Sequence, residues 1–154
     1  MTQLSTNFSL KEFTKSETAT RLGLDNTPNE EVIGRLKTLV ETIIQPVRDH
    51  FGKTTINSGY RSPESNAAVG GSKTSDHCKG FAADIEVPGV ANGDLAEYIK
   101  ANFKFTQLIL EFYTQGIPDS GWVHVSYDPS NLKCECLTAV KQNGKTVYLK
   151  GIQA

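Results

Sequence analysis

The chain has 154 residues, 16 basic and 17 acidic side chains, and a formal net charge of −1. A chain of this length buries roughly 68–70% of its unfolded surface, so its core needs no disulfide or metal for stability. We therefore expect one domain over residues 1–154. A pI near 6.3 leaves no basic surplus to bind nucleic acid or an anionic membrane, and the sequence predicts neither as a partner.

The sequence also predicts no insertion into a membrane. Residues 1–10 are polar, and no segment approaches the ~20 apolar residues that a membrane span requires. Without a signal peptide we expect synthesis in the cytoplasm, with action outside the cell dependent on release by other means. The 3 cysteines, Cys78, Cys134 and Cys136, are odd in number, so we expect free thiols rather than a disulfide framework. On one strand, Cys134 and Cys136 would share a face.

Helical signals dominate the first third of the chain. Ser9 can cap a short helix that runs through Phe13, and residues 22–28 are rich in turn formers. Over residues 29–51, apolar side chains recur at three- and four-residue steps, which predicts an amphipathic helix capped by its asparagine. Pro46 lies inside this pattern, so we expect it to kink or tighten the last turns.

Strand signals dominate the rest. Pro63 is placed to open a short helix, residues 70–75 are typical of a loop, and Asn92 can cap a helix that ends near Asn102. The segments that predict strands are 54–58, 81–87, 106–112, 122–127, 133–140 and 146–149, the last two joined by the turn Gln142-Asn143-Gly144. We therefore predict an α+β fold, with N-terminal helices packed on a mainly antiparallel sheet.

Two histidines and one aspartate are the strongest chemical signal. His77 begins a run that ends at Asp84, and His124 lies on a later predicted strand. Two imidazoles and a carboxylate form a common catalytic zinc shell that leaves a fourth position for water. Gly80 would allow the backbone to bend and bring His77 towards Asp84. By itself the spacing also fits a loop histidine, a turn aspartate and a half-buried strand histidine.

Several ordered motifs make the pattern more specific. They are Ser75-x-His77-x-x-Gly80-x-Ala82-x-Asp84 and Trp122-Val-His124-Val, preceded by Ser58-Gly59-Tyr60-Arg61-Ser62-Pro63 and Asn66-Ala-Ala-Val-Gly70-Gly71. This set resembles the zinc-site signature of the D-alanyl-D-alanine metallopeptidases, which belong with lysostaphin and the hedgehog signalling domain in the LAS group. The opening segment is similar to the phage and bacterial cell-wall branch of that group. The resemblance extends over about residues 7–127.

The resemblance implies a LAS/hedgehog-like fold and specific roles for residues. His77, Asp84 and His124 would hold Zn²⁺, although other divalent metals also suit such ligands. Arg61 matches an arginine that lies beside the metal and orients the substrate, where it would stabilise developing negative charge. A surface arginine in a turn is the simpler alternative. Ser75 would either hydrogen-bond within the site loop or serve the turn alone.

One position departs from the pattern. Many members of the group carry the general base in Glu-x-x-His, and here that position is Gly121. Glu111 is our candidate for the base because it ends an apolar run, where a carboxylate is costly unless it is paired or functional. Asp119 is a weaker candidate and Glu86 a weaker one still. Glu111 could instead be a solvent-facing acid at a strand end.

The predicted function is zinc-dependent hydrolysis of amide bonds in peptidoglycan stem peptides, by a monomer. The enzyme would be a D-Ala-D-Ala carboxypeptidase or an endopeptidase, acting as a phage lysis enzyme (an endolysin), as part of a virion or as a bacterial wall enzyme. Since Gly121 replaces the usual base, one alternative is a catalytically silent, zinc-containing module that binds the cell wall or other virion components. A purely structural phage protein is a further alternative, which the intact ligand residues disfavour.

For the other residues that could carry chemistry, the sequence favours structural roles. His50 ends a predicted helix, where a cation interacts favourably with the helix dipole. Cys78 should point away from its neighbour His77, and no other ligands support a second metal at the remaining two cysteines. We expect Trp122 and Tyr127 to pack against the sheet rather than line a groove.

Overall fold

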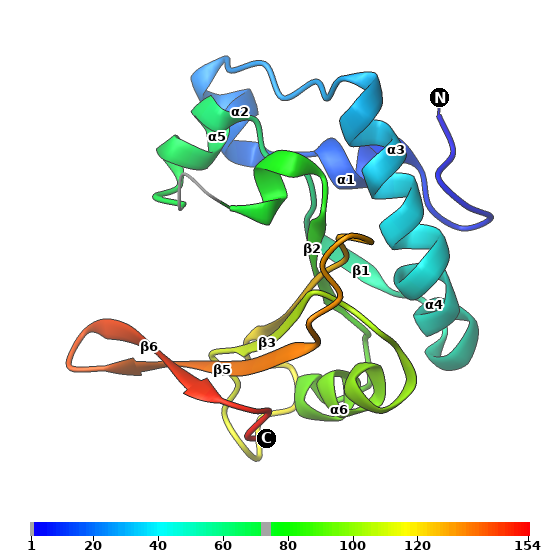
Figure 1. Cartoon of the computed structure of the whole chain (residues 1–154). Helices are drawn as coiled ribbons and strands as arrows, with labels where there is room; N and C mark the ends of the chain where they lie inside the picture. Colours follow the sequence, from blue (N-terminus) through cyan, green and yellow to red (C-terminus); the bar gives the residue numbers. More distant parts are fainter. Residues whose placement is uncertain (1, 72–74) are drawn as a thin grey trace.

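The computed structural model describes residues 2–71 and 75–154, and its fold is α+β as predicted (Figure 1). One six-stranded sheet has the order β1-β2-β4-β3-β5-β6. Among the described strands, β3 and β5 pair in parallel and the other neighbours are antiparallel. The strands are β1 (Thr55–Ser58), β2 (Ala82–Glu86), β3 (Gln107–Glu111), β4 (Trp122–Ser126), β5 (Glu135–Gln142) and β6 (Lys145–Lys150).

Most helices begin where a capping residue predicts them. The helices are α1 (Leu10–Thr14), α2 (Glu17–Leu22), α3 (Glu30–Leu39), α4 (Gln45–Phe51), α5 (Pro63–Ala68) and α6 (Asn92–Asn102), with a π-helical turn η1 (Val40–Ile44) and a 3-10 helix η2 (Asp76–Lys79). Ser9 is the N-cap of α1, as predicted. Helix α2 was not predicted, although Ser16 accepts a hydrogen bond from the Ala19 amide and Gly23 ends the helix in the left-handed conformation.

The long helix predicted over residues 29–51 is present but changes character near its middle. Asn29 caps α3 by accepting a hydrogen bond from the Val32 amide at 2.9 Å. The η1 turn separates α3 from α4, and the Gln45 amide donates to the Val40 carbonyl, five residues earlier. Pro46 follows at once and has no N–H to donate. The turn before Pro46 is therefore wider than an α-helical turn, so of the two predicted outcomes, a kink or a tightening, the tightening is not found.

Two local predictions need correction, and a third lies partly outside the described residues. Ala91 rather than Asn92 is the N-cap of α6, and the buried Asn92 side-chain amide instead donates to Glu86 and to the Ser120 and Gly121 carbonyls just before β4. Strand β5 begins only after Cys134, which has φ = +50°, so the expected same-face pair with Cys136 does not form on the strand. Of the loop predicted at 70–75, residues 72–74 lie outside the described residues.

The two faces of the sheet serve different purposes. Side chains of one set of alternate strand residues, such as Ala83, Leu108 and Val123, join a core with α3, η1, α4 and α6. Figure 1 shows α3 and α4 running beside β1 and β2, with α6 against the other part of the sheet. The opposite alternation carries Asp84 and His124 away from that core. Helices α3, α4 and α6 therefore cover one face of the sheet, and the other face carries Asp84 and His124.

Two further observations concern the cysteines and the helices. All three cysteines are free. Among the residues that the structure describes, no helix is long and apolar enough to cross a membrane.

Candidate metal centre and catalytic pocket

Strand pairing brings the first two candidate ligands together. Asp84 on β2 lies directly opposite His124 on β4, in the antiparallel register of the two strands. Directly opposite residues point to the same face of a sheet. The His124 Nδ1 atom therefore reaches the Asp84 Oδ1 atom at 3.1 Å, although the two residues are 40 apart in sequence.

A short 3-10 helix positions the third ligand. The Ser75 hydroxyl accepts a hydrogen bond from the His77 amide at the start of η2, which gives Ser75 the turn role considered from the sequence. Gly80 ends η2 with φ = +81°, and a Cβ atom there would lie 2.8 Å from Val32. The chain thus turns tightly enough for His77 Nε2 to lie 3.3 Å from Asp84 Oδ1.

The loop after β1 fixes the orientation of the His77 ring. His77 Nδ1 lies 2.7 Å from the Gly59 carbonyl oxygen, which can only accept, so Nδ1 carries a proton. When the ring is neutral, as metal binding requires, Nε2 is then the nitrogen available as a ligand. The Arg61 amide donates to the His77 carbonyl at 3.1 Å. Gly59 itself lies against α1, where a Cβ atom would meet the Phe13 carbonyl oxygen at 2.5 Å. The N-terminal helix therefore supports the histidine through this loop.

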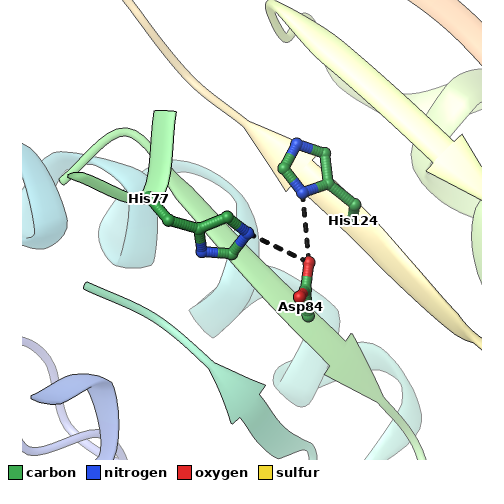
Figure 2. Close-up of side chains that lie close together, drawn as sticks. All are labelled: His77, Asp84 and His124. Carbon is green, nitrogen blue, oxygen red and sulfur yellow. Dashed lines mark hydrogen bonds and ion pairs between the residues drawn. The ribbon is translucent and has the colours of Figure 1, made fainter. Parts of the chain in front are cut away.

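The three donor atoms fit zinc in number, type and spacing. Figure 2 shows the two imidazoles converging on the Asp84 carboxylate from either side. One donor atom from each of His77, Asp84 and His124 lies within 4.8 Å of the others, and all three residues are buried. Zinc ligands at about 2.0–2.2 Å in a tetrahedron lie roughly 3.4 Å apart, close to the spacing of Asp84 Oδ1 from each ring. This is the one such group found among the described residues.

The charge of the pocket favours a cation. Burial raises the pKa of Asp84, but attraction from His77 and hydrogen bonds from both rings outweigh it and hold the pKa below its usual value. Burial lowers the pKa of His124, whereas the hydrogen bond and charge of Asp84, together with Glu111, bring it above the usual value. A buried carboxylate is stable only when a positive charge compensates it. A proton on His124 or a metal ion can supply that charge.

Glu111 lies beside this group at the end of β3. It is half-buried, and Trp122 on β4, directly opposite, donates its Nε1–H to Glu111 Oε2 at 2.8 Å. Burial raises the pKa of Glu111, and the negative charge of Asp84 raises it further. Attraction from His124 and the hydrogen bond from Trp122 partly offset both effects. A carboxylate with a raised pKa and a fixed orientation suits proton transfer. The expectation that Trp122 only packs against the sheet was wrong.

The backbone explains why Gly121 cannot be the glutamate of the common pattern. Gly121 has φ = +65°, and a Cβ atom there would lie 2.0 Å from the Glu111 carbonyl oxygen and 2.7 Å from the carbonyl carbon of Phe112. No side chain fits this approach between the end of β3 and the start of β4. Phe112 also has a positive φ of 57°, so the chain turns sharply directly after Glu111. The same turn therefore excludes a base at position 121 and places a carboxylate at position 111.

One cavity of about 370 Å³ joins these groups. Arg61 lines it, and the Arg61 Nε atom is buried without a hydrogen-bond partner among the described residues. The full lining consists of Arg61, Ser75, Asp76, His77, Asp84, Gln107, Ile109, Glu111, Trp122, His124 and Tyr148. Arg61 therefore lines the same cavity as the candidate ligands, unlike the simple surface arginine in a turn that the sequence also allowed.

Other residues considered from the sequence lie elsewhere. Glu86 and Asp119 line a separate cavity, and the Glu86 carboxylate accepts hydrogen bonds from Asn57 and Asn92. His50 lies in the last turn of α4 and stacks on a tyrosine ring at 4.2 Å, in a structural setting. Tyr127 packs against the core as predicted.

Tyr148 and Gln107 line the cavity but were not singled out from the sequence. Tyr148 comes from the last strand, and only the pairing of β3, β5 and β6 brings it to the site. A weak signal was present in the alternation of β6, where Tyr148 is an aromatic residue that shares its face with the polar Thr146 and Lys150.

The cavity is lined by two imidazoles, a buried carboxylate, a glutamate and an arginine. This combination of groups is that of a pocket of the metallohydrolase class. The sequence model of the peptidase M15 family matches residues 6–126, and the chain belongs to this family. The protein is therefore a zinc-dependent metallopeptidase of the cell-wall type, as the motifs predicted. A search of curated proteins finds no match to the chain.

Glu111→Gln should stabilise the zinc-free protein in a pH-dependent way. The pKa of Glu111 is raised on folding, so the folded state loses stability as pH rises through that pKa. Glutamine cannot ionise and keeps an oxygen for Trp122. Urea unfolding in chelator, from about pH 4 to about pH 8, should show a gain in the free energy of unfolding that grows with pH. Glu97→Gln, exposed on α6, controls for loss of a surface charge. A gain that is constant or shrinks with pH contradicts this assignment.

Gly121→Ala should destabilise the fold more than Gly116→Ala. Both glycines have positive φ, but a Cβ atom at Gly116 meets no atom within 4 Å. The strain of the left-handed conformation, about 1 kcal/mol, is common to both variants. Contact with the backbone at Gly121 should add about 1–3 kcal/mol, measured by chemical denaturation. Equal losses in the two variants would show that the close approach to Glu111 is not needed.

Proposed function

We propose that the protein hydrolyses amide bonds in peptidoglycan stem peptides, with His77, Asp84 and His124 as the zinc ligands. The observation that carries this proposal is the convergence of three donor atoms within 4.8 Å in a cavity that also contains Glu111 and Arg61. Membership of the peptidase M15 family supports a peptide substrate from the cell wall. The donor set leaves a coordination position for the reacting groups.

Each ligand has a distinct supporting contact. The Gly59 carbonyl holds the His77 ring, and the β2–β4 register holds His124 against Asp84. When bound, zinc lowers the pKa of water and polarises the scissile carbonyl. The chain's own contribution is a donor geometry held by the β2–β4 pairing and by η2, which limits reorganisation during the reaction.

We assign the general base to Glu111. Its carboxylate takes a proton from the water that attacks the carbonyl carbon, and it delivers that proton to the leaving amine as the C–N bond breaks. The raised pKa of Glu111 supports both steps, because the group exchanges a proton more readily near neutral pH than an ordinary glutamate. The hydrogen bond from Trp122 orients one oxygen and leaves the other for this transfer.

We assign Arg61 to substrate binding. Arg61 lines the cavity, and its guanidinium can donate to the substrate carbonyl oxygen or to a carboxylate of the stem peptide. Negative charge grows on the carbonyl oxygen during attack, so a fixed guanidinium stabilises the transition state more than the ground state.

A silent zinc-binding module is the alternative, and Gly121 is the observation that favours it. Glu111 argues against this alternative, because it brings a carboxylate into the same cavity from the neighbouring strand. We further propose that the enzyme degrades bacterial walls as a lysis enzyme or virion component, on the basis of the resemblance to phage and bacterial wall peptidases. Its addition to permeabilised bacteria should lower their turbidity, and unchanged turbidity would oppose that role.

Substitutions should separate metal binding from chemistry. His77→Ala and His124→Ala should each lose bound zinc, measured by metal analysis after gel filtration. Glu111→Gln should keep about one zinc ion per chain and lose turnover by about 10²–10⁴-fold. A Glu111→Gln enzyme with near wild-type turnover would refute the assignment of the base.

Mass spectrometry of purified peptidoglycan tests the function itself. Zinc-loaded protein should release new fragments, a chelated sample should release none, and the fragment masses will distinguish a carboxypeptidase from an endopeptidase. Glu111→Gln with zinc bound is the matched control for contaminating enzymes. Intact muropeptides after incubation with the zinc-loaded wild type would favour the binding module.

A further inference from the structure

The C-terminal hairpin lies beyond the family match yet reaches the catalytic pocket. The matched residues end at 126, before β5 and β6 begin. Figure 1 shows the two strands extending the sheet outward as a hairpin. The turn between them uses Asn143 and Gly144 with φ of 53° and 76°, the conformation that a tight two-residue hairpin needs. From this hairpin, Tyr148 lines the same cavity as the three candidate zinc ligands.

The register of four strands places Tyr148 on the same row as the candidate base. Trp122 lies opposite Glu111, Glu111 opposite Ala139, and Ala139 opposite Tyr148. Directly opposite residues point to one face, so these four side chains share the face that carries the site. Adjacent strands are about 4.8 Å apart, which puts Tyr148 roughly 10 Å from Glu111 along this row. The intervening Ala139 has only a methyl group, so both long side chains can extend over it.

The surroundings of Tyr148 suit contact with a ligand rather than packing. Its side chain remains 55% exposed, although β6 fixes its backbone. Burial raises the pKa of the Tyr148 phenol, and the negative charge of Glu111 raises it further. The hydroxyl therefore stays protonated and is available as a hydrogen-bond donor. An exposed aromatic ring with a protonated hydroxyl at the edge of a cavity is typical of a substrate contact.

We propose that Tyr148 is a substrate-binding residue, whose ring forms one wall of the pocket and whose hydroxyl donates to a carbonyl oxygen of the bound peptide. This inference rests on the proposed function, and it gives the hairpin a role in selecting the substrate. Arg61, from the loop after β1, and Tyr148, from the C-terminal hairpin, would then contact the peptide from separate parts of the chain. The substrate class is an extended peptide with free backbone carbonyls.

The test compares three variants of the zinc-loaded enzyme on a stem peptide that the wild type cleaves. Tyr148→Phe should lower kcat/KM about 3- to 10-fold through a higher KM, because one hydrogen bond is lost. Tyr148→Ala should lower kcat/KM further, since the wall is lost as well. Tyr127→Phe, at a tyrosine packed against the core, is the matched control and should stay within about twofold of wild type. Zinc content and thermal unfolding should not change in the Tyr148 variants.

A kcat/KM within about twofold of wild type for Tyr148→Ala would overturn the proposal. If the wild type cleaves no stem peptide, the proposed substrate is wrong, and binding provides a separate readout. A dipeptide hydroxamate chelates zinc and carries peptide carbonyls, so calorimetry can measure its affinity for the same zinc-loaded variants. Tyr148→Ala should weaken that affinity about fivefold or more, whereas Tyr127→Phe should not. Equal affinities for all variants would also overturn the proposal.

Discussion

The buried carboxylate of Asp84, held between two imidazoles, is the interaction on which the rest of the structure depends. A buried negative charge is costly unless a cation and hydrogen bonds compensate it. Asp84 Oδ1 lies 3.3 Å from His77 Nε2 and 3.1 Å from His124 Nδ1. The β2–β4 register, the short helix η2 and the Gly59 carbonyl all serve to hold these three groups in place. The helices on the opposite face make that frame rigid.

A backbone constraint then determines where the second carboxylate can come from. The approach of Gly121 to the Glu111 carbonyl leaves no room for a side chain at position 121. The pocket instead contains Glu111, which lies across from Trp122 and accepts its indole hydrogen bond. Strand pairing therefore brings a carboxylate from β3 into the cavity that the three candidate ligands line, although position 121 carries none.

Local patterns predicted most of the elements and the family, because caps, apolar periods and ordered motifs are local features. Helix α6, the Asn143-Gly144 turn and membership of the M15 family were predicted in this way. The parallel pairing of β3 with β5 was not, because strand order depends on contacts distant in sequence. The position of Tyr148 depends on that order, so no local pattern could reveal it. The single domain and the roles of individual site residues stay predictions.

X-ray absorption at the zinc edge tests the central claim most directly, because it reports which atoms bind the metal. For zinc-loaded wild-type protein we predict a shell of nitrogen and oxygen atoms at about 2.0–2.2 Å, with outer-shell scattering from two imidazole rings. The His124→Ala variant should bind no zinc and so give no such spectrum. If some zinc remains bound, the outer-shell scattering should come from one imidazole ring instead of two. Sulfur scattering at about 2.3 Å, or two-imidazole scattering that persists in His124→Ala, would contradict the assignment of His77, Asp84 and His124.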